Sequence, residues 1–145
     1  MGYNTKFIGS IKLSRALTIA EAKVILEAND NPDSIEGEHP KSYMQWVPTI
    51  GLDAIVYDGN EKFYDYEKWM NWILSLISGF GIEANGVIHW AGEDAIDAGI
   101  LTVNKNQLAV SKAAKTTAFD HPLTLDALAM LALDQITKPI NQPAN

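Results

Sequence analysis

The sequence predicts an α+β domain, for two reasons. Apolar residues recur with the period of a strand in some segments and with the period of a helix in others. These segments follow one another in the order strand, helix, strand, strand, helix, strand, and a strand pair and a late helix come after them. This is the split β-α-β order of ferredoxin-like proteins, with two helices on one face of a sheet, an added C-terminal β-hairpin and a final helix.

The length of 145 residues suits one domain. We expect this domain to cover residues 1–111, followed by a linker over 112–122, a C-terminal helix over 123–137 and a frayed tail over 138–145. Leucines lie almost all round the last helix, which makes self-assembly through Leu125, Leu128 and Leu131 an alternative to a monomer.

The first two elements have clear patterns. Residues 3–13 alternate, with Phe7, Ile11 and Leu13 on one face of a half-buried strand. Residues 17–30 predict a helix that begins with a capping box, because Glu21 follows Thr18 by three residues. Its expected apolar stripe consists of Ile19, Ala22, Ile25, Leu26 and Asn29.

An acidic segment with proline and glycine, residues 30–42, predicts an exposed loop. Two short strands, 43–47 and 52–57, then form a hairpin. Residues 61–81 predict a second helix with Asp65 as its cap, and its buried stripe is expected to comprise Tyr66, Trp69, Met70, Ile73 and Ile77. Strands at 87–90, 99–103 and 107–110 suggest a meander.

Composition excludes several functions. The net charge of −7 and the scattered basic residues disfavour nucleic-acid binding. The absence of cysteine excludes disulfides, thiolate metal sites and a cysteine nucleophile. We find no signal peptide and no apolar run long enough to cross a membrane, so we expect a cytoplasmic protein. No cofactor motif occurs, and we expect no cofactor.

Three carboxylates, Glu93, Asp94 and Asp97, lie between two apolar runs. Oxygen ligands at short spacing suit a divalent metal, but the spacing is not that of an EF-hand. A turn bracketed by glycines, whose carboxylates bind nearby amides or face water, is the favoured interpretation. A metal-dependent enzyme or small-ligand binder that uses this turn is the alternative.

The four tryptophans indicate a binding surface, because Trp and Tyr are common anchors at interfaces. A small domain is not expected to bury four indoles completely. We therefore expect one or two tryptophans at an exposed patch, with Trp46 and Trp72 as the candidates, and we include Trp90 beside the acidic turn among the candidate binding residues.

The pattern G-x-I-x-W-x-G-E-D-x-x-D-x-G-x-L-x-V, at residues 86–103, resembles a motif of an uncharacterised family of small acidic phage, prophage and bacterial proteins. Upstream, residues 45–48, 58–64 and the helix around Trp69 resemble the same family. The resemblance covers residues 2 to about 110 and implies no catalytic residue. Together these patterns favour a non-enzymatic, phage-derived protein-binding module that meets a host or partner protein through the 30–42 loop and the acidic turn.

Overall fold

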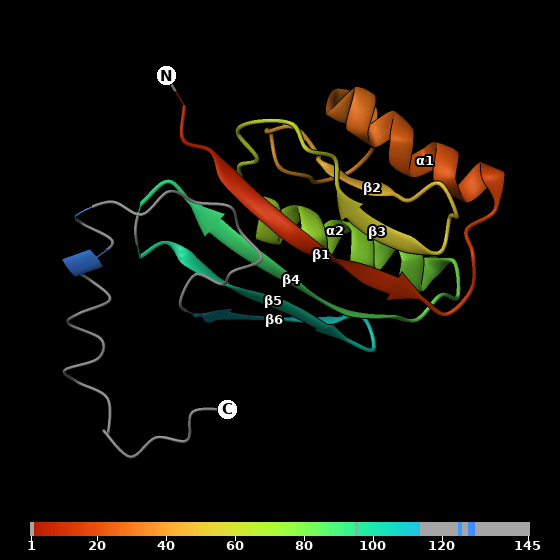
Figure 1. The fold of residues 1–145 in the computed structure, drawn as a ribbon. Coiled ribbons are helices and arrows are strands. Elements are labelled where there is room, and N and C mark those ends of the chain that lie inside the picture. Colours follow the sequence, from red (N-terminus) through yellow and green to blue (C-terminus); the bar gives the residue numbers. More distant parts are fainter. Residues whose placement is uncertain (1, 95, 114–124, 126–127, 130–145) are drawn as a thin grey trace, which may run out of the picture.

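A computed structural model of the chain describes residues 2–94, 96–113, 125, 128 and 129. Within these residues one sheet and two helices form the domain (Figure 1). In chain order the elements are β1 (Thr5–Leu13), α1 (Ile19–Asp30), a 3₁₀ turn (Pro32–Ser34), β2 (Trp46–Pro48), β3 (Ala54–Tyr57), α2 (Tyr66–Gly79), β4 (Ala84–Gly92), β5 (Ala98–Asn104) and β6 (Gln107–Lys112).

The sheet has six strands in the order β2-β3-β1-β4-β5-β6, and every neighbouring pair is antiparallel. β1 pairs with β4 along its whole length, from Thr5 opposite Gly92 to Leu13 opposite Ala84. β4, β5 and β6 are consecutive neighbours, which confirms the predicted meander. The fold is therefore α+β, as the sequence predicts.

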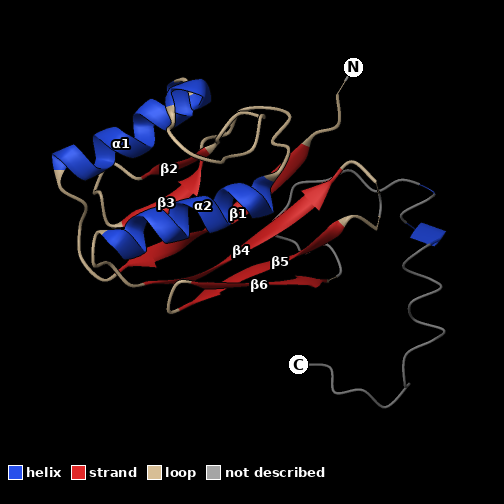
Figure 2. Ribbon diagram, turned by 180° about the vertical axis from the view of Figure 1, so that it is seen from behind, coloured by secondary structure: helices blue, strands red, loops and turns tan. Residues whose placement is uncertain are grey.

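The helices form one layer on the sheet. Figure 2 shows α1 and α2 in front of the strands, and Figure 1 views the sheet from the opposite side. Phe7, Ile11 and Leu13 of β1 face the helices and are buried, while Ile8 and Lys12 point away and are exposed. The predicted alternation is confirmed, and the core fills the space between the two layers.

The predicted start of α1 is confirmed. The Thr18 hydroxyl accepts a bond from the Glu21 amide at 3.1 Å, and the Glu21 carboxylate accepts one from the Thr18 amide at 2.8 Å. The predicted apolar stripe is only partly right, because α1 buries Ala22, Ile25 and Ala28 and leaves Ile19 and Leu26 exposed. The helix meets the core through Ile25 and two alanines, and this orientation turns Ile19 and Leu26 towards solvent.

The predicted face of α2 is confirmed for its most buried residues, which are Trp69, Met70, Ile73 and Ile77. Asp65 occupies the N-cap position of α2, as predicted, but its side chain does not cap the helix. Asp65 precedes the helix with φ of 58° and makes no side-chain bond to a helix amide. Its carboxylate instead accepts a bond from Ser42 at 2.8 Å, so it fastens the preceding loop to the start of α2.

Beyond β6 the structure describes four residues, at positions 113, 125, 128 and 129. β6 runs to Lys112, one residue past the boundary predicted for the domain. Of the predicted linker, 112–122, only the first two residues are described, and Lys112 belongs to β6. The predicted tail and most of the predicted C-terminal helix, including Leu131, lie outside the described residues. Leu125 and Leu128 are described and are 84% and 50% exposed. In the described part of the chain, no helix has the length and apolar character needed to cross a membrane.

Candidate functional site

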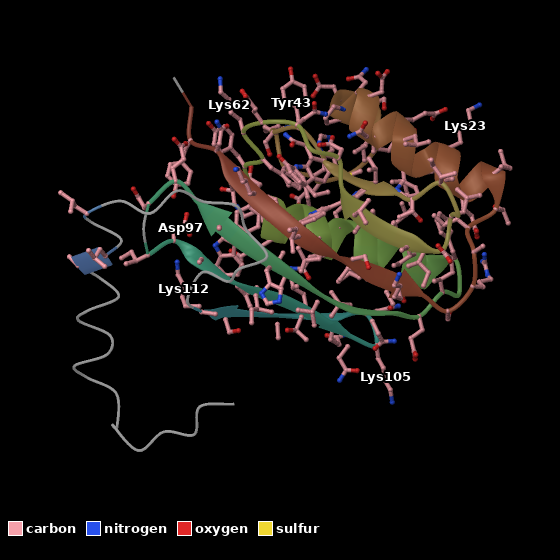
Figure 3. All side chains as sticks on the ribbon, in the orientation of Figure 1. Lys23, Tyr43, Lys62, Asp97, Lys105 and Lys112 are labelled. Carbon is pink, nitrogen blue, oxygen red and sulfur yellow. The ribbon has the colours of Figure 1, made fainter. Side chains whose placement is uncertain are left out.

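The acidic turn between β4 and β5 is organised around Asp97. One carboxylate oxygen accepts a hydrogen bond from the Tyr3 hydroxyl at 2.7 Å, and the other accepts one from the Trp90 indole at 3.0 Å. The ammonium of Lys112, which is well exposed, lies 3.6 Å from the same carboxylate and over the Trp90 ring. Asp97 therefore joins the N-terminal segment, β4 and β6 at one end of the sheet, where Figure 3 shows Asp97 and Lys112.

The electrostatics of this cluster follow from its bonds. Burial by itself would raise the pKa of Asp97, but the bonds from Tyr3 and Trp90 and the charge of Lys112 outweigh it and lower the pKa. Burial, together with the Asp97 carboxylate, raises the pKa of Tyr3 to about 12. Burial is also the main reason that the pKa of Tyr66 rises to about 12. Asp97 is thus a charged acceptor held by the Tyr3 hydroxyl and the Trp90 indole, and the raised pKa values keep the Tyr3 and Tyr66 hydroxyls protonated near pH 7.

The other two carboxylates of the turn do not converge with Asp97. Glu93 accepts a bond from the Asn4 amide, and Asp94 is exposed. Among the described residues, no group of three or more His, Asp or Glu side chains is arranged to hold a metal ion. The metal alternative based on Glu93, Asp94 and Asp97 therefore finds no support in the geometry. Tyr3, which binds both Asp97 and the Asp94 amide, was not identified from the sequence because it lies about ninety residues from the turn.

The expected exposure of Trp46 is wrong. Trp46 is fully buried in the core, where its indole donates to the Tyr66 carbonyl at 3.0 Å. Trp90 is also buried beneath the acidic turn. Trp69 is buried as well, and its indole donates to the Ser42 hydroxyl at 3.1 Å. The small domain buries three indoles because each polar N–H meets an acceptor inside the fold.

Trp72 is the one tryptophan that keeps part of its surface accessible. It lies on α2, packs edge-to-face on Trp69 with ring centroids 5.5 Å apart, and lines a groove of about 300 Å³. The other lining residues come from α1 and the segment after it, with one more from α2: Val24, Glu27, Ala28, Ser34, Ile35, Glu36 and Leu76. The buried stripe that periodicity predicts for α2 includes neither Trp72 nor Leu76, and periodicity does not show which residues face these two.

The groove, which we call the Trp72 groove, has an apolar floor and an acidic rim. Ile35, Leu76 and Trp72 form the floor and pack against the core. Glu27 and Glu36 stand at the rim and are exposed. The rim continues into an exposed acidic stretch with Asp30, Asp33 and Glu38. A cationic group outside the groove would therefore meet exposed carboxylates, of which Glu27 already lies 3.8 Å from the Lys23 ammonium.

The segment that forms one wall is fastened at both ends. The Asn31 side chain caps the 3₁₀ turn by accepting from the Asp33 amide at 3.2 Å. Further along, the His39 ring stacks on Trp69 with centroids 5.8 Å apart, and Ser42 bonds to Asp65. The wall is thus held near α2 without a strand or helix longer than one turn.

The groove and the acidic turn are separate surfaces. They share no lining residue. Figure 3 shows Asp97 at one end of the molecule and Lys23, the α1 neighbour of Val24, at the other. The sequence prediction of one surface built from the loop and the turn therefore divides into a structural corner at Asp97 and a groove at Trp72.

Comparison with known proteins gives no further assignment. No protein-family model matches the chain, and no significant match was found among curated proteins or solved structures.

Proposed function

We propose that the protein is a non-enzymatic protein-binding module that holds a short segment of a partner protein in the Trp72 groove. The segment would carry a large apolar side chain flanked by lysine or arginine. The apolar chain would cover the indole of Trp72 and the side chains of Ile35 and Leu76, and the cation would face Glu27 and Glu36.

The observation that carries the proposal is an accessible indole at the floor of a groove with carboxylates on its rim. Buried aromatic anchors supply most of the affinity at interfaces, and charges at the rim supply orientation and association rate. A volume of about 300 Å³ is at the lower limit of pockets that enclose a small molecule, and it suits one or two side chains. The net charge of −7 also favours association with a positively charged partner.

Two finer predictions belong with this proposal. We propose that β1 to β4 with α1 and α2 form a ferredoxin-like split β-α-β unit, supported by the order β2-β3-β1-β4 with antiparallel neighbours. A phage or prophage origin is supported only by the motif at residues 86–103. A cytoplasmic location stays a prediction from composition.

The test is a selection from a displayed library of random dodecapeptides, followed by affinity measurements on the selected peptides. We expect an apolar residue next to Lys or Arg, and binding that weakens as salt rises. Trp72→Ala should weaken binding about 30-fold, because loss of a hot-spot tryptophan costs about 2 kcal/mol or more. Glu36→Lys should also weaken it, and its exposed position leaves the fold intact.

Tyr43→Ala is the matched control, since Tyr43 is an aromatic residue that is 68% exposed and does not line the groove. Peptides that bind the Trp72→Ala and Tyr43→Ala variants equally well would refute the groove as the binding site. Thermal unfolding of each variant separates lost binding from lost folding.

A further inference from the structure

The two edges of the sheet differ in how open they are to another strand. β2 forms one edge, has only three residues and ends in Pro48. Short length and proline are features by which natural edge strands avoid pairing with other chains. β6 forms the other edge, runs over six residues and contains neither proline nor glycine. Figure 2 shows β6 at the edge of the sheet away from α1, and no strand in the described part of the chain pairs with its outer side.

The backbone of β6 offers hydrogen-bonding groups to a further strand. The Ala113 amide, directly after β6, donates to the Ala98 carbonyl of β5 at 3.2 Å. In an antiparallel pair, alternate residues of a strand turn their amide and carbonyl groups to the same neighbour. Every second residue back from Ala113 therefore also bonds to β5. The residues between them turn their amides and carbonyls to the outer side of β6, and these are Leu108, Val110 and Lys112.

The side chains of β6 leave room for a neighbouring strand on both sides of the sheet. Leu108 and Val110 lie opposite buried residues of β5 and so project to the helix side. Leu108 packs against the core, whereas Val110 is 42% exposed. On the other side of the sheet, β6 carries the small side chains of Ala109 and Ser111. A strand added to this edge would therefore cover the apolar surface of Val110 and meet only small side chains opposite it.

From these observations we propose that β6 pairs with β6 of a second copy of this chain, antiparallel about a two-fold axis through Val110, so that two sheets join into one. In this register Val110 lies opposite Val110 of the second copy, and Leu108 lies opposite Lys112. All three outward-facing residues of each copy then find partners, with about six hydrogen bonds between the chains. A register centred on the neighbouring residue would pair only two of the three. The edge is thus self-complementary, as a two-fold interface requires.

The charges near β6 agree with pairing between two copies. The strand carries no carboxylate, although the chain has a net charge of −7. Its one cation, Lys112, lies 3.6 Å from Asp97 of the same chain, and the proposed register places it opposite Leu108 rather than a second lysine. Like charges directly opposite one another would destabilise the strand pair, and this register brings none together. β6 shares no residue with the Trp72 groove, so the two surfaces can be tested separately.

The first test measures the mass of the full-length chain by analytical ultracentrifugation from micromolar to millimolar concentration. We expect an equilibrium between monomer and dimer. Val110→Pro removes the outward amide, so two-fold symmetry removes both central bonds at once, while the bonds from β6 to β5 remain. This substitution should weaken dimerisation at least tenfold. Val110→Thr is the matched control, because threonine keeps the amide and the branched side chain, and it should dimerise like the parent.

The second test uses a single introduced cysteine, since the full-length chain has none of its own. Val110→Cys places two thiols across the two-fold axis, where the facing Cα atoms lie about 5.5 Å apart, within the range of a disulfide. Val24→Cys is the matched control, because Val24 is 43% exposed, against 42% for Val110, but lies on α1. With copper phenanthroline as the oxidant, Val110→Cys should form a covalent dimer at least tenfold faster than Val24→Cys.

Two results of the first test would overturn the proposal. One is a full-length chain that stays monomeric at millimolar concentration. The other is a folded Val110→Pro variant, as judged by its thermal unfolding, that dimerises as tightly as the parent. Equal rates of disulfide formation for Val110→Cys and Val24→Cys would also overturn it. If Val110→Pro does not fold, the comparison of the two cysteine variants decides.

Discussion

Removing the Asp97 carboxylate tests whether the acidic turn is a structural corner. Asp97→Ala removes the acceptor of two bonds, from Tyr3 at 2.7 Å and from the Trp90 indole at 3.0 Å. Bonds to a charged partner contribute about 1.5–3 kcal/mol each, and the buried indole N–H cannot exchange its lost partner for water. The Tyr3 hydroxyl is more accessible, and the exposed Lys112 ion pair adds little.

These contributions give a loss of about 3 kcal/mol in the free energy of unfolding. For a domain of this size the loss corresponds to a decrease in Tm of about 10 °C. Urea and thermal unfolding followed by circular dichroism measure both quantities. Asp94→Ala, on the same turn but exposed, should remain within about 0.5 kcal/mol of the parent. Equal effects of the two substitutions would refute the assignment of Asp97 as the structural acceptor.

The pH dependence gives a second measure of the same contribution. The pKa of Asp97 is lower in the folded chain than in the unfolded one, so the folded state binds its proton less readily. Its stabilising contribution is present above the unfolded value of about 4 and is lost as the pH falls through the folded value. The difference in stability between the parent and Asp97→Asn should therefore narrow below about pH 4. A difference that stays constant down to pH 2 would contradict this reasoning.

Three further outcomes are expected. The bond from Arg15 lowers the pKa of Glu21 to about 2. In chemical unfolding, the parent should therefore be more stable than Glu21→Gln at pH 5, and this difference in stability should disappear between about pH 4.5 and 2. Gly9→Ala should lower the free energy of unfolding by well over about 1 kcal/mol, because the φ of Gly9 is 120° and a Cβ would overlap a backbone oxygen. Gly59→Ala should lower it by only about 1 kcal/mol in the same assay, because Gly59 also has a positive φ but its Cβ would meet open space. Trp46→Ala should cost about 3–5 kcal/mol or prevent folding, as judged by near-UV circular dichroism, because Trp46 is fully buried.

Local sequence signals predicted the elements that depend on neighbouring residues. The capping box at Thr18 and Glu21 needs only a spacing of three, and it is present in the structure. The turn after Asn104 also depends on neighbouring residues. Lys105 and Asn106 both adopt positive φ there and join β5 to β6. Burial along β1 follows from alternation.

The candidate sites depend on contacts between residues that are far apart in the sequence. Predictions from the sequence were wrong for some of these residues. No signal in the sequence separates Trp46 from Trp72. In the structure the Trp46 indole donates a hydrogen bond inside the core, whereas Trp72 lines a groove. Leu26 fits a helical stripe, yet α1 packs on the core through Ala22, Ile25 and Ala28 and leaves Leu26 exposed. Periodicity defines a face of a helix, whereas the neighbouring layer decides which face is buried.

By itself the sequence determined the fold class, the order of the elements, the acidic charge and the absence of cysteine chemistry, because composition and periodicity are properties of the chain alone. Only the tertiary structure decided that Asp97 meets Tyr3 and Trp90 and that Trp72 lines a groove with residues of α1. Each of these contacts joins segments that are far apart in the sequence. The sheet order and the helix layer bring those segments within a few ångströms, and short-range sequence patterns do not show which distant segments become neighbours.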